Sequence, residues 1–311
     1  MSQPKRRYRV RNWPAYNAAL VQRGALTIWV EESSLSCWYG NERAGRPGAP
    51  TRYSDQMIQM GLVLREVFHL PLRALEGFLG TVVQWLGLRG VTVPDYTTFC
   101  RRQQRLEVRI PRRVPQDRSL HLVIDSSGLK IHGEGEWKRR MHGPGARRRW
   151  RKLHLAMDPE SGQAMACVLT ADFVTDDQVL PELLEQVSDV PLASVTGDGA
   201  YDTRACHAAV MKRGAHPLFP PREGATEWED DHPRTAAIQA IRERGRGQWK
   251  QDSGYHRRSL VENAFFRLKQ LFGARLGNRR FDAQCTQAYC RIAALNRMTG
   301  LGMPKTEPVA A

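Results

Sequence analysis

The sequence predicts a mixed α/β domain preceded by a helical segment. From residue 119 onward, short apolar runs typical of strands alternate with longer stretches of helical periodicity. Between residues 54 and 108, apolar side chains recur only at helical spacing. We therefore divide the chain into an aromatic and basic arm, a helical domain, an α/β domain with an inserted segment, and a short tail: 1–53, 54–112, 113–302 with an insertion at about 221–253, and 303–311.

The composition indicates a polyanionic partner. Lysine and arginine number 47 against 32 acidic residues, so the net charge is +15, and cationic side chains that neutralise phosphates release condensed counterions. No apolar run approaches the roughly 18 residues of a membrane span, and Met1–Arg11 lacks the apolar core of a signal peptide. The 6 cysteines are scattered without a CxxC pair, as in a reduced compartment. We expect a cytoplasmic protein without a membrane partner.

The helical domain carries its own start signals. Ser54 can cap a first helix, Pro71 can open a second, and Asp95 can cap a third. The third helix brings three arginines: Arg101, Arg102 and Arg105. Three short helices ending in a basic one fit a helix-turn-helix that contacts DNA. A helical packing subdomain without any DNA contact is equally compatible with the pattern.

The α/β domain begins with a strand at 120–124 that we expect to end at Asp125. Further strands are expected at 152–157, 164–169, 193–196 and 216–219, and helices near 179–187, 202–212, from Ser259 and at 282–297. The strand at 193–196 leads to Asp198. We interpret Asp176 and Asp177 as caps of the 179–187 helix rather than as metal ligands.

Two aspartates, Asp125 and Asp198, thus follow strands. Ligand sites in α/β sheets gather at the carboxyl ends of strands, and carboxylates without nearby His or Cys suit Mg²⁺ or Mn²⁺. Small residues after each aspartate would leave room for a bulky substrate. Taken singly, however, either aspartate could merely cap the next turn.

The segment around Glu262 is more informative. On one continuous helix, Tyr255, Arg258, Glu262 and Lys269 would fall within a sector of about 60°. A carboxylate among two cations and a phenol suits metal and phosphate together. The alternative is that Ser259 and Glu262 form a capping box, with Glu262 satisfying only the helix start.

The combination Tyr255-x2-Arg258-x3-Glu262-x6-Lys269 resembles the signature of the insertion sequence 4 and 5 groups of DDE transposases. The surroundings resemble the insertion sequence 5 family in particular, over nearly the whole chain. The matching segments are residues 123–130 (VIDSSGLK), 133–137 (GEGEW), 150–154 (WRKLH), 198–202 (DGAYD) and 254–262 (GYHRRSLVE), together with the opening Asn12-Trp13-Pro-x-Tyr16 and the closing 294–298 (ALNRM).

This resemblance implies a ribonuclease-H-like catalytic core in which Asp125, Asp198 and Glu262 are catalytic and hold two divalent ions, Mg²⁺ with Mn²⁺ as a substitute. It implies hydrolysis at the ends of a bacterial insertion element, followed by attack of the freed 3′-hydroxyl on target DNA. The partners would be double-stranded DNA, as terminal inverted repeats and target, and a second copy in a synaptic homodimer near the nucleoid. A DNA-binding regulator and a nuclease on the same fold are the competing interpretations.

Several other side chains are DNA-binding candidates. The basic run before and within the second strand is interpreted as a loop that reaches phosphates, or alternatively as a solvated charged loop: Lys138, Arg139, Arg140, Arg147, Arg148, Arg149, Arg151 and Lys152. In the insertion, Trp228 and Trp249 are candidates for a wedge against an unstacked base, the alternative being that they pack the insertion onto the core.

Overall fold

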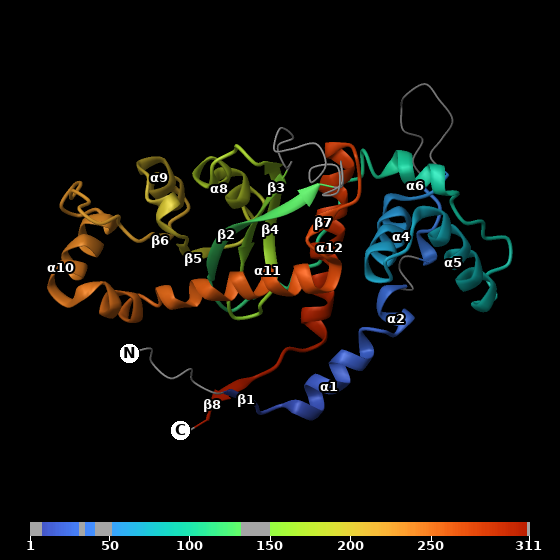
Figure 1. The fold of residues 1–311 in the computed structure, drawn as a ribbon, viewed down its shortest axis with the longest axis horizontal. Coiled ribbons are helices and arrows are strands. Elements are labelled where there is room, and N and C mark those ends of the chain that lie inside the picture. Colours follow the sequence, from blue (N-terminus) through green and yellow to red (C-terminus); the bar gives the residue numbers. More distant parts are fainter. Residues whose placement is uncertain (1–7, 31–34, 41–51, 132–149, 310–311) are drawn as a thin grey trace, which may run out of the picture.

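The computed structural model describes residues 8–30, 35–40, 52–131 and 150–309, and Figure 1 shows how their elements are arranged. Its centre is a six-stranded mixed sheet with the strand order β4-β3-β2-β5-β6, and β7 also pairs with β2. The strands are β2 (Leu120–Ile131), β3 (Trp150–Met157), β4 (Ala164–Ala171), β5 (Leu192–Thr196), β6 (His216–Leu218) and β7 (Arg275–Leu276). β3 runs antiparallel to β2 and β4, whereas β5, β6 and β7 run parallel to their neighbours. The prediction of a mixed α/β domain is confirmed.

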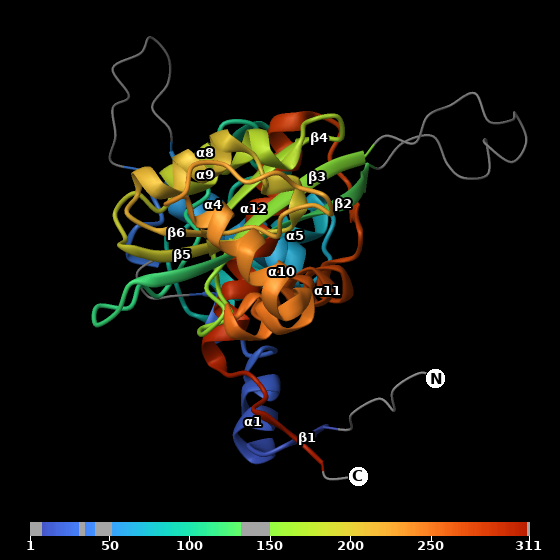
Figure 2. The same ribbon diagram turned by 90° about the vertical axis from the view of Figure 1, so that its left-hand side faces the viewer.

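Helices cover both faces of this sheet. α8 (Asp176–Glu185) and α9 (Arg204–Lys212) share an apolar cluster with one face, and α11 (Ser259–Phe272) and α12 (Phe281–Leu301) share another with the opposite face. Figure 2 shows α8 and α9 on one side of the strands and α11 on the other. Along β2, Leu122 and Ile124 point to the α8 side and Val123 points to the α11 side, as strand alternation requires.

The first part of the chain is helical, as predicted. α4 (Asp55–Val67), α5 (Leu72–Trp85) and α6 (Tyr96–Arg102) are present. The Ser54 hydroxyl accepts a bond from the Met57 N–H, Pro71 precedes α5, and the Asp95 carboxylate caps α6. α6 ends at Arg102, so Arg105 lies beyond it rather than within the helix.

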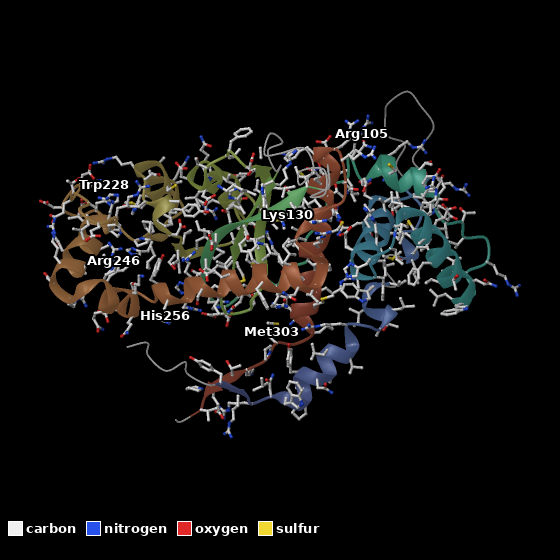
Figure 3. The ribbon with its side chains drawn as sticks, in the orientation of Figure 1. Arg105, Lys130, Trp228, Arg246, His256 and Met303 are labelled. Carbon is white, nitrogen blue, oxygen red and sulfur yellow. The ribbon has the colours of Figure 1, made fainter. Side chains whose placement is uncertain are left out.

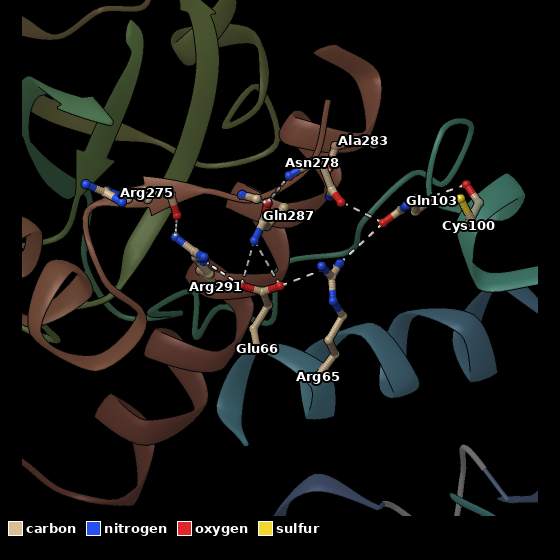
Figure 4. Close-up of polar contacts among 10 residues, drawn as sticks. Arg65, Glu66, Cys100, Gln103, Arg275, Asn278, Ala283, Gln287 and Arg291 are labelled. Atoms are coloured by element: carbon tan, nitrogen blue, oxygen red, sulfur yellow. Dashed lines mark hydrogen bonds and ion pairs between the residues drawn. The ribbon is translucent and has the colours of Figure 1, made fainter. Parts of the chain in front are cut away.

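The helical segment shares its core with the α/β domain. The cluster that includes Met57 and Leu64 of α4 continues into Ala293 of α12. A buried polar network crosses the same seam: the Arg291 Nε donates to Glu66 at 2.6 Å, and the Gln287 amide donates to both Glu66 oxygens (Figure 4). The domain boundary at 112 is thus crossed by a continuous core.

The two ends of the described chain meet in a small ribbon apart from the main sheet. β1 (Tyr8–Val10) pairs antiparallel with β8 (Thr306–Pro308), and α1 (Trp13–Gln22) and α2 (Leu26–Trp29) lead from it to α4 (Figure 1). The Arg9 guanidinium donates to Glu307 at 2.6 Å across the ribbon.

One predicted boundary was wrong. β2 does not end at Asp125 but continues to Ile131, because the residues after Asp125 pair with β3 from His154 back to Trp150. Gly128 permits this, since a Cβ there would lie 3.2 Å from the Trp150 ring. Gly128 therefore makes room for the tryptophan of the neighbouring strand.

The insertion contains a helix, α10 (Pro233–Asp252), which is interrupted at Gly245, where φ is 81°. Such a φ favours glycine because it lacks a Cβ. Among the described residues, no helix is long and apolar enough to cross a bilayer.

Candidate active site

Three elements place the predicted carboxylates around one region. Asp125 lies in the middle of β2 and, by strand alternation, on the α11 face. Asp198 follows β5, and its side chain accepts a bond from the Ala200 N–H. Glu262 lies in the first turn of α11. The Asp125 side chain is 17% exposed and that of Glu262 55%, so one carboxylate is largely buried and the other largely faces solvent.

Arg258 bridges two of these carboxylates. Its Nη1 donates to Asp125 Oδ2 at 2.9 Å, and its Nη2 donates to Glu262 Oε1 at 2.7 Å. The two residues joined in this way come from β2 and from the start of α11. Charge-assisted bonds of this kind are among the strongest in proteins, so the guanidinium neutralises part of the negative charge of both carboxylates.

The pKa values of Asp125 and Arg258 are both shifted by the charged groups around them. Burial raises the pKa of Asp125, the Ser126 N–H and Arg258 oppose this, and the charge of Asp198 adds to it. Burial alone would lower the pKa of Arg258, but the nearby Asp125, Tyr255, Glu262 and Asp198 outweigh it, so this pKa is raised. Asp198 is thus close enough to act on both partners of the ion pair.

The donor set fits a hard divalent cation, although not in the side-chain arrangement seen here. Within the described ranges, no three His, Cys, Asp or Glu side chains are grouped closely enough to hold one ion. The physical reason is that Arg258 stands between Asp125 and Glu262. Carboxylate oxygens are the ligands that Mg²⁺ prefers, and the exposed Glu262 has room to move.

The expected single helical face is only partly present. Residues Tyr255–Arg258 form a short 3-10 helix, η2, and α11 begins at Ser259. Lys269 Nζ reaches back to β2 and donates to Ser127 Oγ at 2.7 Å. Tyr255 is buried and packs on Trp249, with ring centroids 5.6 Å apart. Arg258 and Lys269 therefore lie near the carboxylates, whereas the Tyr255 ring is packed against Trp249 and interacts with Arg258.

The capping-box alternative is not observed for Glu262. The helix does start at Ser259, but the start of α11 has no side-chain cap bond, and the Ser259 hydroxyl donates instead to the His256 carbonyl. Glu262 bonds to Arg258, one turn before it. Its carboxylate is therefore committed to the charged cluster.

Asp176 adjoins this site on the other face of the sheet, and its interpretation as a helix cap was wrong. Thr175 caps α8, and Asp176 and Asp177 lie in the first turn. Asp176 accepts a bond from Ser126 Oγ at 3.1 Å and pairs with Lys152 Nζ at 2.6 Å. Asp176 thus links Lys152 of β3 to Ser126 of β2, next to Asp125. The only trace of this contact in the sequence is an acidic residue at the start of a predicted helix.

The two tryptophans of the insertion pack against protein. Trp249 is buried. Trp228 lies between two guanidiniums, with Arg204 at 4.6 Å and Arg234 at 4.3 Å from its ring centroid. These contacts favour the packing interpretation over the base-wedge interpretation for both residues.

The remaining basic candidates divide into three groups. Arg101 and Arg105 are exposed, and Arg105 lies at the end of the molecule opposite Trp228 (Figure 3). Arg102 is held by Asp55 and the Tyr53 carbonyl, and Arg151 by Gln284. The others lie outside the described residues: Lys138, Arg139, Arg140, Arg147, Arg148 and Arg149.

The comparisons with known proteins identify the family of this chain. Residues 116–297 match a family model described as a transposase DDE domain, and residues 21–134 match a second model with the same description. The first match spans more than half of the chain, so this protein belongs to the transposases with a DDE domain, a family that uses divalent metal ions. Among solved structures, the piggyBac transposase synaptic complex with hairpin DNA is similar at 10% identity and a TM-score of 0.37, over 90% of this chain and 73% of that one.

Proposed function

We propose that this protein is the transposase of an insertion element of the insertion sequence 5 family, with a ribonuclease-H-like core. It would bind the terminal inverted repeats of its element, cleave the DNA at the ends and join the 3′-hydroxyls to target DNA as a synaptic homodimer. The observation that carries the proposal is the pairing of Asp125 and Glu262 through Arg258, with the charge of Asp198 near enough to help raise the pKa of Arg258, within a chain whose family is that of DDE transposases.

Asp125, Asp198 and Glu262 would hold two divalent ions, Mg²⁺ or Mn²⁺, which supply charge stabilisation and an activated water or 3′-hydroxyl. Arg258 would then leave the carboxylates and bind a phosphate oxygen of the DNA. Lys269, anchored near β2 through Ser127, would stabilise the developing negative charge on the phosphate. Tyr255 is buried against Trp249, so no covalent protein–DNA intermediate at this phenol is expected.

Two groups of basic residues are proposed to bind DNA. Arg101 and Arg105 of the helical domain are exposed and would contact phosphates, whether or not α4, α5 and α6 form a helix-turn-helix. The basic run at 138–149 would serve the same purpose. The net charge of +15 supports this assignment.

The test is cleavage and strand transfer on DNA that carries the element's own ends, in Mg²⁺ and in Mn²⁺. We expect Asp125→Asn, Asp198→Asn and Glu262→Gln to lose both reactions while they retain end binding. Asp189→Asn is the matched control, because Asp189 is an exposed carboxylate paired with Arg112. If the three variants cleave like wild type, the active-site assignment is wrong. Cleavage without joining would indicate a nuclease, and binding without cleavage by wild type would indicate a regulator.

A further inference from the structure

One aromatic side chain of α11 faces solvent next to the proposed catalytic glutamate. Phe266 is 63% exposed, whereas the apolar face of the same helix is fully packed, with Phe265 and Phe272 both 5% exposed. Phe266 is therefore not exposed because the apolar face of α11 is poorly packed; it lies on a different face of the helix. Its position follows from the helix geometry, since residues four apart lie on the same face, one turn from each other.

The neighbours of Phe266 on the exposed stripe are all polar. Glu262 lies one turn before it, and the stripe also holds Asn263 and Gln270, both exposed. At about 100° per residue, Phe266 lies near the middle of this stripe, with Lys269 at one edge. An aromatic ring flanked by amides and cations has the chemistry of a nucleotide-binding surface: rings stack on bases, amides bond to base edges, and cations hold phosphates.

We propose that Phe266 packs on the base of a nucleotide beside the scissile phosphate, with Asn263 and Gln270 bonding to its neighbours. The proposal rests on the proposed function, because the occupant is the DNA end that Glu262 would help to cleave. Charge supports DNA rather than protein as the occupant: the chain carries a net charge of +15, and Arg258 and Lys269 lie on the same side of the helix. Trp228 and Trp249, the two earlier candidates for contact with a base, both pack against other side chains of the protein.

The test compares Phe266→Ala and Phe266→Trp with wild type. Phe173→Ala is the matched control, because Phe173 is 83% exposed but lies between β4 and α8, outside the α11 stripe. Binding to end DNA is measured by fluorescence anisotropy without divalent metal. A fluorescent base analogue beside the cleavage position, in duplex and in frayed DNA, reports stacking.

We expect Phe266→Ala to weaken end binding roughly 5- to 150-fold, the range for loss of one base–aromatic stack. We also expect it to abolish the quenching of the base analogue, Phe266→Trp to restore both, and Phe173→Ala to behave as wild type. Quenching in frayed but not duplex DNA would identify the base as unpaired.

Unchanged binding and quenching in Phe266→Ala would overturn the proposal. So would a loss of self-association in that variant with DNA binding intact, because Phe266 would then belong to a protein interface. The proposed function fails separately, when wild type does not cleave the element's ends and join them to target DNA.

Discussion

The ion pair of Arg258 makes a prediction that runs against the usual effect of removing a residue from an active site. Arg258 bonds to Asp125 and Glu262, the carboxylates that would hold metal, so guanidinium and metal compete for the same oxygens. Replacement by the neutral Arg258→Gln should therefore tighten metal binding in the absence of DNA. The removal of one positive charge acts in the same direction.

The size of the effect follows from the two bonds. A hydrogen bond to a charged group contributes about 1.5–3 kcal/mol, which suits the bond to the largely buried Asp125. At about 1.4 kcal/mol per tenfold, release of this bond corresponds to a 10- to 150-fold gain in affinity. The pair with the exposed Glu262 adds at most about 1 kcal/mol, or roughly fivefold.

The assay is calorimetric or spectroscopic titration with Mn²⁺, free of DNA, on wild type, Arg258→Gln and Arg257→Gln. Arg257 is the matched control, because it adjoins Arg258 but pairs with Glu160. Cleavage by Arg258→Gln should fall, since the variant loses its phosphate-binding cation, so affinity and activity should move in opposite directions. Mn²⁺ affinity equal to or weaker than that of wild type would refute the competition.

Three further predictions concern stability. Arg291→Met should lower the free energy of unfolding by about 3–5 kcal/mol, because it leaves Glu66 charged and buried; replacement of both residues by methionine should recover much of the loss in a denaturant titration. Gly197→Ala should cost about 1–3 kcal/mol, since its Cβ would lie 2.6 Å from the Tyr201 ring, and a thermal midpoint equal to that of wild type would contradict this. Burial lowers the pKa of His154 from 6.5 to about 4, so from pH 6.5 down to about 4 only the unfolded chain binds a proton there, and stability should fall by up to about 3 kcal/mol. His154→Gln should flatten that pH dependence, and an unchanged slope would exclude His154 as its source.

Local signals in the sequence predicted most elements of the fold. The caps at Ser54 and Asp95 were found because each needs only a side chain and one or two N–H groups within the next three residues. The extension of β2 beyond Asp125 was missed, since serine and glycine after an aspartate are typical of a turn. Pairing with β3 and β7 overrides this local preference. Because those strands are distant in the sequence, the local pattern around Asp125 does not reveal the pairing.

The candidate site likewise has local contacts that the sequence predicted and long-range contacts that it did not. The spacing of Arg258 and Glu262 predicted their contact, because it needs only one helical turn. The bond from Arg258 to Asp125 spans 133 residues, so no local pattern could show it. The burial of Tyr255 was also missed, because the change from η2 to α11 ends the continuous helix on which the predicted face depended.

The insertion shows how these long-range contacts are organised. At the start of α10, Arg234 donates two bonds to Asp202, at 2.7 and 3.0 Å, four residues after Asp198. At its end, Trp249 packs on Tyr255, three residues before Arg258. The helix between these anchors is interrupted at Gly245, so the insertion is fastened near the proposed catalytic Asp198 at one end and near the bridging Arg258 at the other. The polar segment that the sequence marked as an insertion thus holds the chain next to Asp198 and next to Arg258, and in this way it supports the geometry of the candidate site.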